Sequence, residues 1–198
     1  ALHGFTEDAI PMWVADMDFR APREVAEAIK RVADHNIYGY TDYREDYIEA
    51  IQGWYRQRHG YTPQPEWLQM TPGVVFAVTA ALHAFTSPGE GVMVQRPVYY
   101  PFSNMIEWNG RRVVNSPLTL DGAGYTIDFD AFERDLKENG VRMFIFCNPH
   151  NPVGKVWSRE DVVRIGEVCL KHNVLVLSDE IHCDFAMFGN KHTIFPSI

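Results

Sequence analysis

The stretch Asn173-Val-Leu-Val-Leu-Ser178, followed at once by Asp179-Glu-Ile-His-Cys-Asp184, is the part of the sequence that decides the fold. Its first six residues form a short, mostly apolar run, which predicts a buried parallel β-strand. In an open α/β sheet the carboxyl ends of the strands face the ligand crevice, so Asp179 is a candidate site residue. Successive side chains on an extended segment alternate in direction, so we expect Glu180 to point away and to lie outside the site.

A second strand of the same kind lies just upstream. Met143-Phe-Ile-Phe-Cys147 is apolar throughout and continues into the loop Asn148-Pro-His-Asn-Pro-Val-Gly154. Neighbouring parallel strands end at the same edge of a sheet. The two strand ends therefore offer a carboxylate from Asp179, an imidazole from His182 and an amide from Asn151 to one crevice.

The composition excludes several classes of partner. The 198 residues carry a net charge of −8, with 46% hydrophobic and 22% charged residues, which is ordinary for a globular domain. Nucleic-acid binding depends on clustered Lys and Arg, which are absent, so we expect no nucleic-acid partner. No apolar run reaches the length of a membrane span and no signal-peptide pattern opens the chain, so we expect no membrane attachment and a cytoplasmic location.

The three cysteines, Cys147, Cys169 and Cys183, cannot all pair within the chain and follow neither a zinc nor a disulfide spacing. We expect three buried or half-buried free thiols. The sequence His182-Cys183-Asp184 offers metal-ligating side chains, but adjacent residues on an extended segment point in different directions. We therefore predict no metal site.

The chain as a whole alternates strands and helices. Periodicity and the flanking Gly, Pro and Asp residues predict, in order, an extended arm through Phe19, helices over 22–34 and 43–59, a short strand over 67–70, a helix that follows 71–75 and runs to Phe85, a strand over 91–95, a helix from Met105, a strand over 112–115, a helix opened by Asp128, a strand over 142–147 and a helix over 158–172. Ser158 and Asp161 form a capping pair for the last helix. This alternation predicts a three-layer α/β/α fold with a mainly parallel sheet.

The segment Thr71-Pro-Gly-Val-Val75 lies between a predicted strand and a predicted helix. In this arrangement unpaired backbone N–H groups, at the positive end of the helix dipole, face a phosphate. A glycine before a helix is common, so this signal is weak by itself. The segment matches neither Gly-x-Gly-x-x-Gly nor a P-loop, which excludes the usual nucleotide-binding motifs.

Together, Asn148-Pro-His-Asn-Pro-Val-Gly154 and, one helix later, Ser178-Asp-Glu-Ile-His-Cys-Asp184 resemble the fold-type-I pyridoxal phosphate (PLP) enzymes of the class I and II aminotransferase superfamily. His182, where most aminotransferases of this superfamily have a Tyr, is typical of the MalY/PatB subfamily of carbon–sulfur β-lyases. The resemblance covers nearly the whole chain, and its motifs are jointly specific. It implies an incomplete large PLP-binding domain over 37–198, and an N-terminal arm and helix over 1–36 that belong to the small domain.

The resemblance also implies roles for single residues. PLP is the deepest electron sink when its ring nitrogen stays protonated, which an adjacent carboxylate favours, and Asp179 matches that partner. The other implied cofactor contacts are the amides of Gly73, Val74 and Val75 at the phosphate, Tyr99 stacked on the ring, and Asn151 and His182 at the phenolic oxygen. Without the resemblance, Asp179 is a cap, Tyr99 a core residue and His182 a structural histidine. We expect Asp179, Asn151 and 73–75 to share one cavity.

Two further roles rest on the resemblance alone. Val14 and Ala15, in the aromatic-rich arm, would lie near the carboxylate of an amino-acid substrate. The alternative is an arm packed on the domain surface. Tyr40 would cross a dimer interface and reach the cofactor phosphate of the partner subunit, which implies an obligate homodimer, whereas the alternative is a packing aromatic.

The implied activity is that of a PLP-dependent C–S β-lyase, which cleaves cystathionine or cysteine S-conjugates to a thiol, pyruvate and ammonia. An amino-acid aminotransferase and a non-catalytic regulatory or binding protein on the same fold are the alternatives. The Schiff-base Lys of such enzymes lies in a Ser-x-Ser-Lys context, which does not occur in the sequence, and Lys155, Lys171 and Lys191 are expected to be solvated charges. We therefore expect the 198 residues to belong to a longer chain that also carries the carboxylate-binding Arg.

Overall fold

The computed structural model describes residues 8, 10, 17–42, 44–122 and 124–198. The chain divides into two compact units, Ala1–Asp42 and Tyr43–Ile198. The first unit contains helix α1 (Arg23–His35), which ends where Asn36 adopts a left-handed conformation with φ 54°. Val14 and Ala15 lie outside the described residues.

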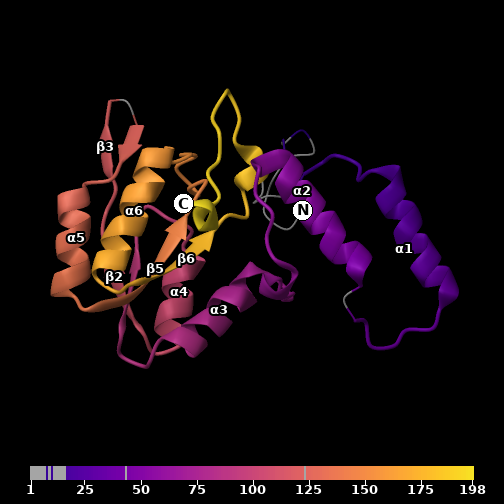
Figure 1. Cartoon of the computed structure of the whole chain (residues 1–198), viewed down its shortest axis with the longest axis horizontal. Helices are drawn as coiled ribbons and strands as arrows, with labels where there is room; N and C mark the ends of the chain where they lie inside the picture. Colours follow the sequence, from indigo (N-terminus) through magenta and orange to yellow (C-terminus); the bar gives the residue numbers. More distant parts are fainter. Residues whose placement is uncertain (1–7, 9, 11–16, 43, 123) are drawn as a thin grey trace. The chain divides into compact units, whose positions relative to one another are not determined.

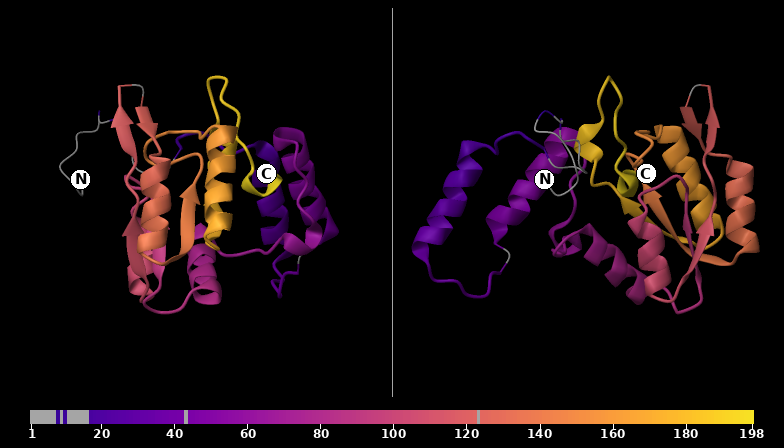
Figure 2. Two further views of the ribbon diagram at one scale, coloured as in Figure 1. Left: turned by 60° about the vertical axis from the view of Figure 1, so that its left-hand side comes forward. Right: turned by 180° about the vertical axis from the view of Figure 1, so that it is seen from behind.

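The second unit is built on a four-stranded sheet in the order β2-β1-β5-β6, in which every neighbouring pair is parallel (Figure 1). Its strands are β1 (Gly91–Val94), β2 (Arg112–Asn115), β5 (Val141–Cys147) and β6 (Leu175–Asp179). An antiparallel hairpin, β3 (Thr119–Asp121) with β4 (Gly124–Thr126), projects beyond the sheet (Figure 2). The helices are α2 (Glu45–His59), α3 (Val74–Phe85), α4 (Pro101–Trp108), α5 (Phe129–Glu138) and α6 (Arg159–Lys171), with short 3₁₀ turns η1 (Pro65–Trp67), η2 (Cys183–Phe185) and η3 (Phe195–Ser197).

The side chains of β5 show how the layers form. Met143, Ile145 and Cys147 pack in one buried cluster with residues of α3 and α4, whereas Phe144 and Phe146 pack in a second cluster with residues of α5 and α6. Alternate residues of a strand point to opposite faces of a sheet, so each face of this one is covered by its own pair of helices. This arrangement confirms the predicted three-layer α/β/α fold with a mainly parallel sheet.

The strand predicted over 173–178 forms as β6, but the prediction that it is buried is wrong. Leu175 is exposed, and the next three residues are half-buried. The reason is the place of the strand in the sheet: β6 is hydrogen-bonded to β5 on one side and, among the described residues, has no strand on the other. Asn173 has φ 53° in the turn after α6, so the strand begins at Leu175.

Two other predicted elements need correction. The strand predicted over 67–70 does not form: η1 ends at Trp67, and the residues after it pair with no described strand. An extended segment becomes a β-strand only where a neighbour satisfies its N–H and C=O groups. The helix predicted from Met105 begins four residues earlier, at Pro101, because proline is well suited to the first position of a helix.

All three cysteines are buried free thiols, as predicted. Burial raises the pKa of Cys147 and of Cys169 to about 12, so both stay protonated at neutral pH. Within the part of the chain that the structure describes, no helix is both long and apolar enough to cross a membrane.

Candidate cofactor site

The end of β6 is where the sheet presents its polar residues. Cys147 of β5 is in register with Asp179, and Phe146 is in register with Ser178. Because Cys147 faces α3 and α4, Asp179 faces those helices too, while Ser178 faces α5 and α6. Continued alternation places Glu180 on the same side as Ser178.

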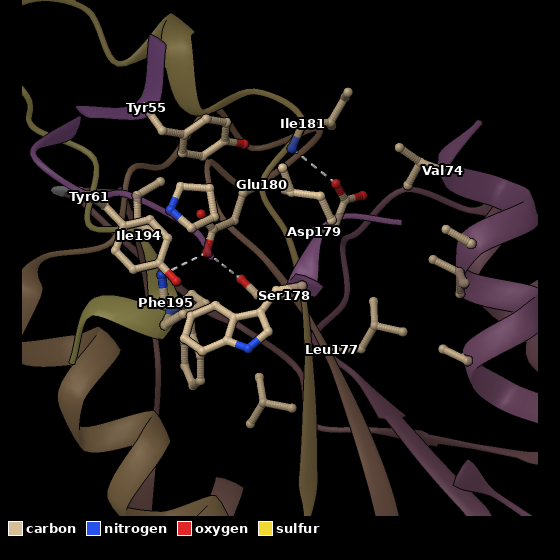
Figure 3. Close-up of a pocket in the computed structure, with 18 of the residues that line it drawn as sticks. Tyr55, Tyr61, Val74, Leu177, Ser178, Asp179, Glu180, Ile181, Ile194 and Phe195 are labelled. Carbon is tan, nitrogen blue, oxygen red and sulfur yellow. Dashed lines mark hydrogen bonds between the residues drawn. The ribbon is translucent and has the colours of Figure 1, made fainter. Parts of the chain in front are cut away.

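The close-up in Figure 3 agrees with this alternation. The Asp179 carboxylate points toward Val74 at the beginning of α3, and the Glu180 carboxylate points to the opposite side, toward Phe195. The predicted opposite orientation of the two acids is therefore confirmed. Adjacent residues of one backbone segment thus place their carboxylates in two different polar environments.

Asp179 is buried, with 8% of its surface exposed. Its Oδ1 accepts a hydrogen bond of 3.2 Å from the N–H of Ile181. Burial raises the pKa of the Asp179 carboxyl, opposed by that N–H and by the charge of His182, while the Glu180 charge raises it further. No Lys, Arg or His of the described residues forms an ion pair with it. A cation or cationic ring bound beside such a buried carboxyl would favour its charged form.

The beginning of α3 supplies the opposite polarity. Gly73 is its N-cap, with φ 131° and ψ 163°, and makes no side-chain capping bond. The first hydrogen bond of the helix runs from the N–H of Ala77 to the carbonyl of Gly73, at 3.1 Å. The N–H groups of the three residues between them have no described partner, which makes this helix end a site for an anion such as phosphate. Val74 and Val75 are both exposed.

A cavity of about 710 Å³ lies along the free edge of β6. Val74, Asp179 and Glu180 line it. The remaining walls are mostly apolar and come from α2, α3, β6 and the η1 and η3 regions, including Tyr55, Tyr61, Trp67, Leu68, Ala77, Val78, Leu177, Ile194 and Phe195. Its size suits a small-molecule ligand.

Asn151 does not line this cavity, and neither do Gly73 and Val75, so of the places expected to share one cavity only Val74 and Asp179 line this one. The cavity follows the outer edge of β6, whereas Asn151 follows the inner strand β5. Its loop is nonetheless tied to the same end of the sheet. The N–H of Asn151 bonds the Cys147 sulfur at 3.4 Å, and the N–H of Asn148 bonds the Asp179 carbonyl at 3.0 Å.

Three other predicted contacts also lie outside the lining of this cavity. Tyr99 is half-buried and packs edge-on against Phe102, with ring centroids 5.5 Å apart. His182 is half-buried, and its ring centroid lies 6.2 Å from that of Phe185. Tyr40, in the first unit, is fully exposed. Each of these side chains keeps its predicted role only as a proposal.

Two residues that the sequence analysis did not assign to the site contribute to its organisation. His150 is 2% exposed, and its Nε2 donates to the carbonyl of Pro97 at 3.0 Å, which ties the loop after β5 to the loop after β1. Burial lowers the pKa of His150, so its ring is neutral. Glu180 lines the cavity although it was predicted to lie outside the site. No local pattern could have indicated this, because two partners of its carboxylate lie at 192 and 195.

His59, Cys183 and Asp184 form a group whose metal-ligating atoms all lie within 4.8 Å of one another. Hydrogen bonds account for the carboxylate, since its Oδ1 pairs with Nε2 of His59 and its Oδ2 accepts from Nε1 of Trp54, both at 2.9 Å. Burial raises the pKa of the Cys183 thiol, which keeps it protonated and a poor metal ligand. The group ties α2 to the segment after β6.

The last strand of this parallel α/β sheet directs a buried carboxylate, which has no ion-pair partner among the described residues, toward the uncapped beginning of a helix. This arrangement is typical of proteins that bind an anionic ligand with a cationic group at the carboxyl edge of the sheet. The chain belongs to the class I and II aminotransferase family, whose model matches residues 7–195.

Within this family, the chain is similar to several proteins of known name. The chain is 51% identical over its whole length to cystathionine β-lyase PatB of Bacillus subtilis, and 30% identical over 98% of its length to the protein MalY of Escherichia coli. Among solved structures, cystalysin of Treponema denticola, which contains a PLP cofactor, matches 97% of the chain with a TM-score of 0.92 and 39% identity. The chain covers 51%, 50% and 49% of these three proteins, and so spans about half their length.

Proposed function

We propose that the full-length protein is a PLP-dependent carbon–sulfur β-lyase that cleaves cystathionine or a cysteine S-conjugate to a thiol, pyruvate and ammonia. The observation that carries this proposal is the buried Asp179 carboxylate, which lacks an ionic partner among the described residues and faces the open beginning of α3. Support comes from PatB, a cystathionine β-lyase 51% identical to this chain, and from the PLP that cystalysin contains.

The residues fit the charges of this cofactor. Asp179 would hold the proton on the pyridine nitrogen, because an adjacent carboxylate favours the protonated ring. The free N–H groups of Val74 and Val75 would bind the phosphate, and Gly73 would let that backbone adopt its positive φ. PLP, when bound, supplies an electron sink for the bonds that break at the α- and β-carbons of the substrate.

The other predicted contacts complete this proposal. Tyr99 would cover one face of the ring, and Asn151 and His182 would bind its phenolic oxygen. Asn151 and His182 both follow strand ends at the same edge of the sheet as Asp179. The lysine that binds the cofactor aldehyde, and the arginine that binds the substrate carboxylate, would come from the part of the protein outside these 198 residues.

We further propose a homodimer with shared active sites, in which Tyr40 reaches the phosphate of the partner's cofactor. Its full exposure leaves the side chain available for such a contact. Val14 and Ala15 would line the substrate entrance. The cytoplasmic location stays a prediction of the sequence.

An aminotransferase is the second candidate, because the matching family model is named for that activity and the two reactions begin alike. The full-length protein with L-cystathionine separates them. A lyase releases thiol and pyruvate without any added keto acid. Amino transfer that requires a keto acid and releases no thiol would reject the lyase.

The proposed role of Asp179 is tested by the variant Asp179→Ala of the full-length protein. Glu180→Ala is the comparison variant. Removing the charge opposite the ring nitrogen should lower kcat by about 10²–10³-fold, the usual loss for one preorganised electrostatic contact. Glu180→Ala should lower it by clearly less, because that carboxylate points to the other side. Equal losses would show that the assignment of the two acids is wrong.

A further inference from the structure

The Glu180 carboxylate has more hydrogen-bond partners and is more buried than a solvent-exposed charge would be. Its Oε1 accepts from the hydroxyl of Ser178 at 2.9 Å and from the N–H of Phe195 at 2.8 Å, and its Oε2 pairs with Nε2 of His192 at 3.1 Å (Figure 3). The Glu180 side chain is 13% exposed and that of His192 is 1% exposed. Three hydrogen bonds to a buried carboxylate fix the position of its side chain.

These three donors come from two separate parts of the chain. Ser178 belongs to β6, whereas His192 lies on the returning half of the loop between η2 and η3, drawn in yellow in Figure 1, and Phe195 is the first residue of η3. Glu180 therefore joins the strand end to the returning loop. At the near end of the loop, Asp184 is bound by His59 and Trp54 of α2. The His59 and His192 rings meet edge-on, with centroids 5.9 Å apart.

The anchored residue and the candidate cofactor residue are neighbours. Asp179 and Glu180 leave the same extended backbone on opposite faces, so a rotation of one about the strand axis moves the other. Among the described residues, the Asp179 carboxylate accepts one hydrogen bond, from the N–H of Ile181, and Ile181 lies in the same turn and moves with it. The backbone at this point is held on one side by the pairing with β5 and the N–H of Asn148, and the side-chain contacts that add to this restraint are those of Glu180.

We propose that Glu180 is a positioning residue, which by binding the returning segment at His192 and Phe195 holds Asp179 toward the beginning of α3. The proposal rests on the proposed PLP site. It assigns Glu180 no contact with cofactor or substrate.

The test uses the full-length protein with PLP removed and then titrated back, followed by the visible absorbance of the bound cofactor. Glu180→Ala should raise the Kd for PLP by about tenfold or more, as the loss of a supporting contact behind a ligating group does. The absorbance maximum should also shift, because the charge opposite the ring nitrogen is displaced. Glu180→Gln keeps an acceptor for Phe195 and should restore most of the affinity. Glu167→Ala, an exposed acid on α6, is the matched control and should leave both readouts unchanged.

The stability of the cofactor-free protein distinguishes positioning from support of the fold. If Glu180→Ala lowers the melting temperature but leaves the PLP affinity and absorbance maximum as in the wild type, Glu180 only stabilises the fold and the proposal is overturned. If Glu180→Ala does not fold, His192→Leu removes one of the three contacts, because leucine has no donor, and should weaken PLP binding by about threefold with a shifted maximum. An unshifted maximum there rejects the proposal. A wild-type protein that binds no PLP rejects the proposed function instead.

Discussion

The two faces of the sheet are covered by helices that begin in different ways. On one face, α5 and α6 are closed by side chains: Asp128 accepts from two backbone N–H groups, and Ser158 and Asp161 form a reciprocal capping box. On the other face, α3 and α4 begin at Gly73 and Tyr100 without any side-chain capping bond. The open helix ends are thus on the face toward which Asp179 points.

This difference does not come from the packing of the core. Each face has its own cluster of buried side chains, and β5 contributes fully buried residues to both. What differs is whether the polar ends of the helices are satisfied within the chain. A helix end that the chain itself caps contributes to stability alone, whereas an uncapped end beside a buried acid is available to a ligand.

The largest expected effect tests whether the two faces are equally well packed. Phe144→Ala, on the α5 and α6 face, should cost about 3–5 kcal/mol of unfolding free energy, and Ile145→Ala, on the α3 and α4 face, about 2–5 kcal/mol. Both side chains are almost completely buried. Urea unfolding measures both losses. A loss at Ile145 below about 1 kcal/mol would mean that the face of the candidate site is loosely packed, and that its open helix ends reflect poor packing.

A smaller effect should separate the two kinds of helix beginning. Gly73→Ala forces a side chain onto φ 131°, a strained conformation that costs about 1–3 kcal/mol, and should also weaken PLP binding by the full-length protein. Steric crowding is not the cause, because a Cβ at Gly73 would have no atom within 4 Å. Ser158→Ala is the matched change on the other face and should cost about 1 kcal/mol while leaving PLP affinity unchanged.

Urea unfolding and PLP titration of both variants check this pair. If Ser158→Ala weakened PLP binding as much as Gly73→Ala, the division between a structural and a ligand-binding helix end would be wrong.

The smallest expected effect concerns Asp179 in the cofactor-free protein. Because burial raises its pKa, the folded state holds the proton more tightly than the unfolded state does. Stability attributable to this group therefore falls as pH rises from its unfolded pKa, about 3.9, through the raised folded value. Asp179→Asn lacks this charge, so the variant should be more stable than the wild type at pH 7, and the difference should vanish near pH 3 (about one unit below the unfolded pKa). A wild type that is the more stable at pH 7 would show that the carboxylate is already paired within the chain.

Much of this structure follows from local sequence patterns. The apolar strands around 92–94 and 143–147, the helix over 159–171 with its Ser158 cap, and the alternation that separates Asp179 from Glu180 all depend on residues a few positions apart. The motif after β5 and the motif after β6 indicated the family, which the family model and the relatives confirm.

The tertiary structure decided the rest. Whether 67–70 is a strand, and whether β6 is buried, depends on which segment lies beside each of them, and such neighbours are far away in the sequence. The same holds for Glu180, whose partners at 192 and 195 return from a loop. Periodicity determines which way a side chain points along its own strand. Only long-range packing determines what it meets there, because hydrogen-bond partners and burial are set by the whole chain at once.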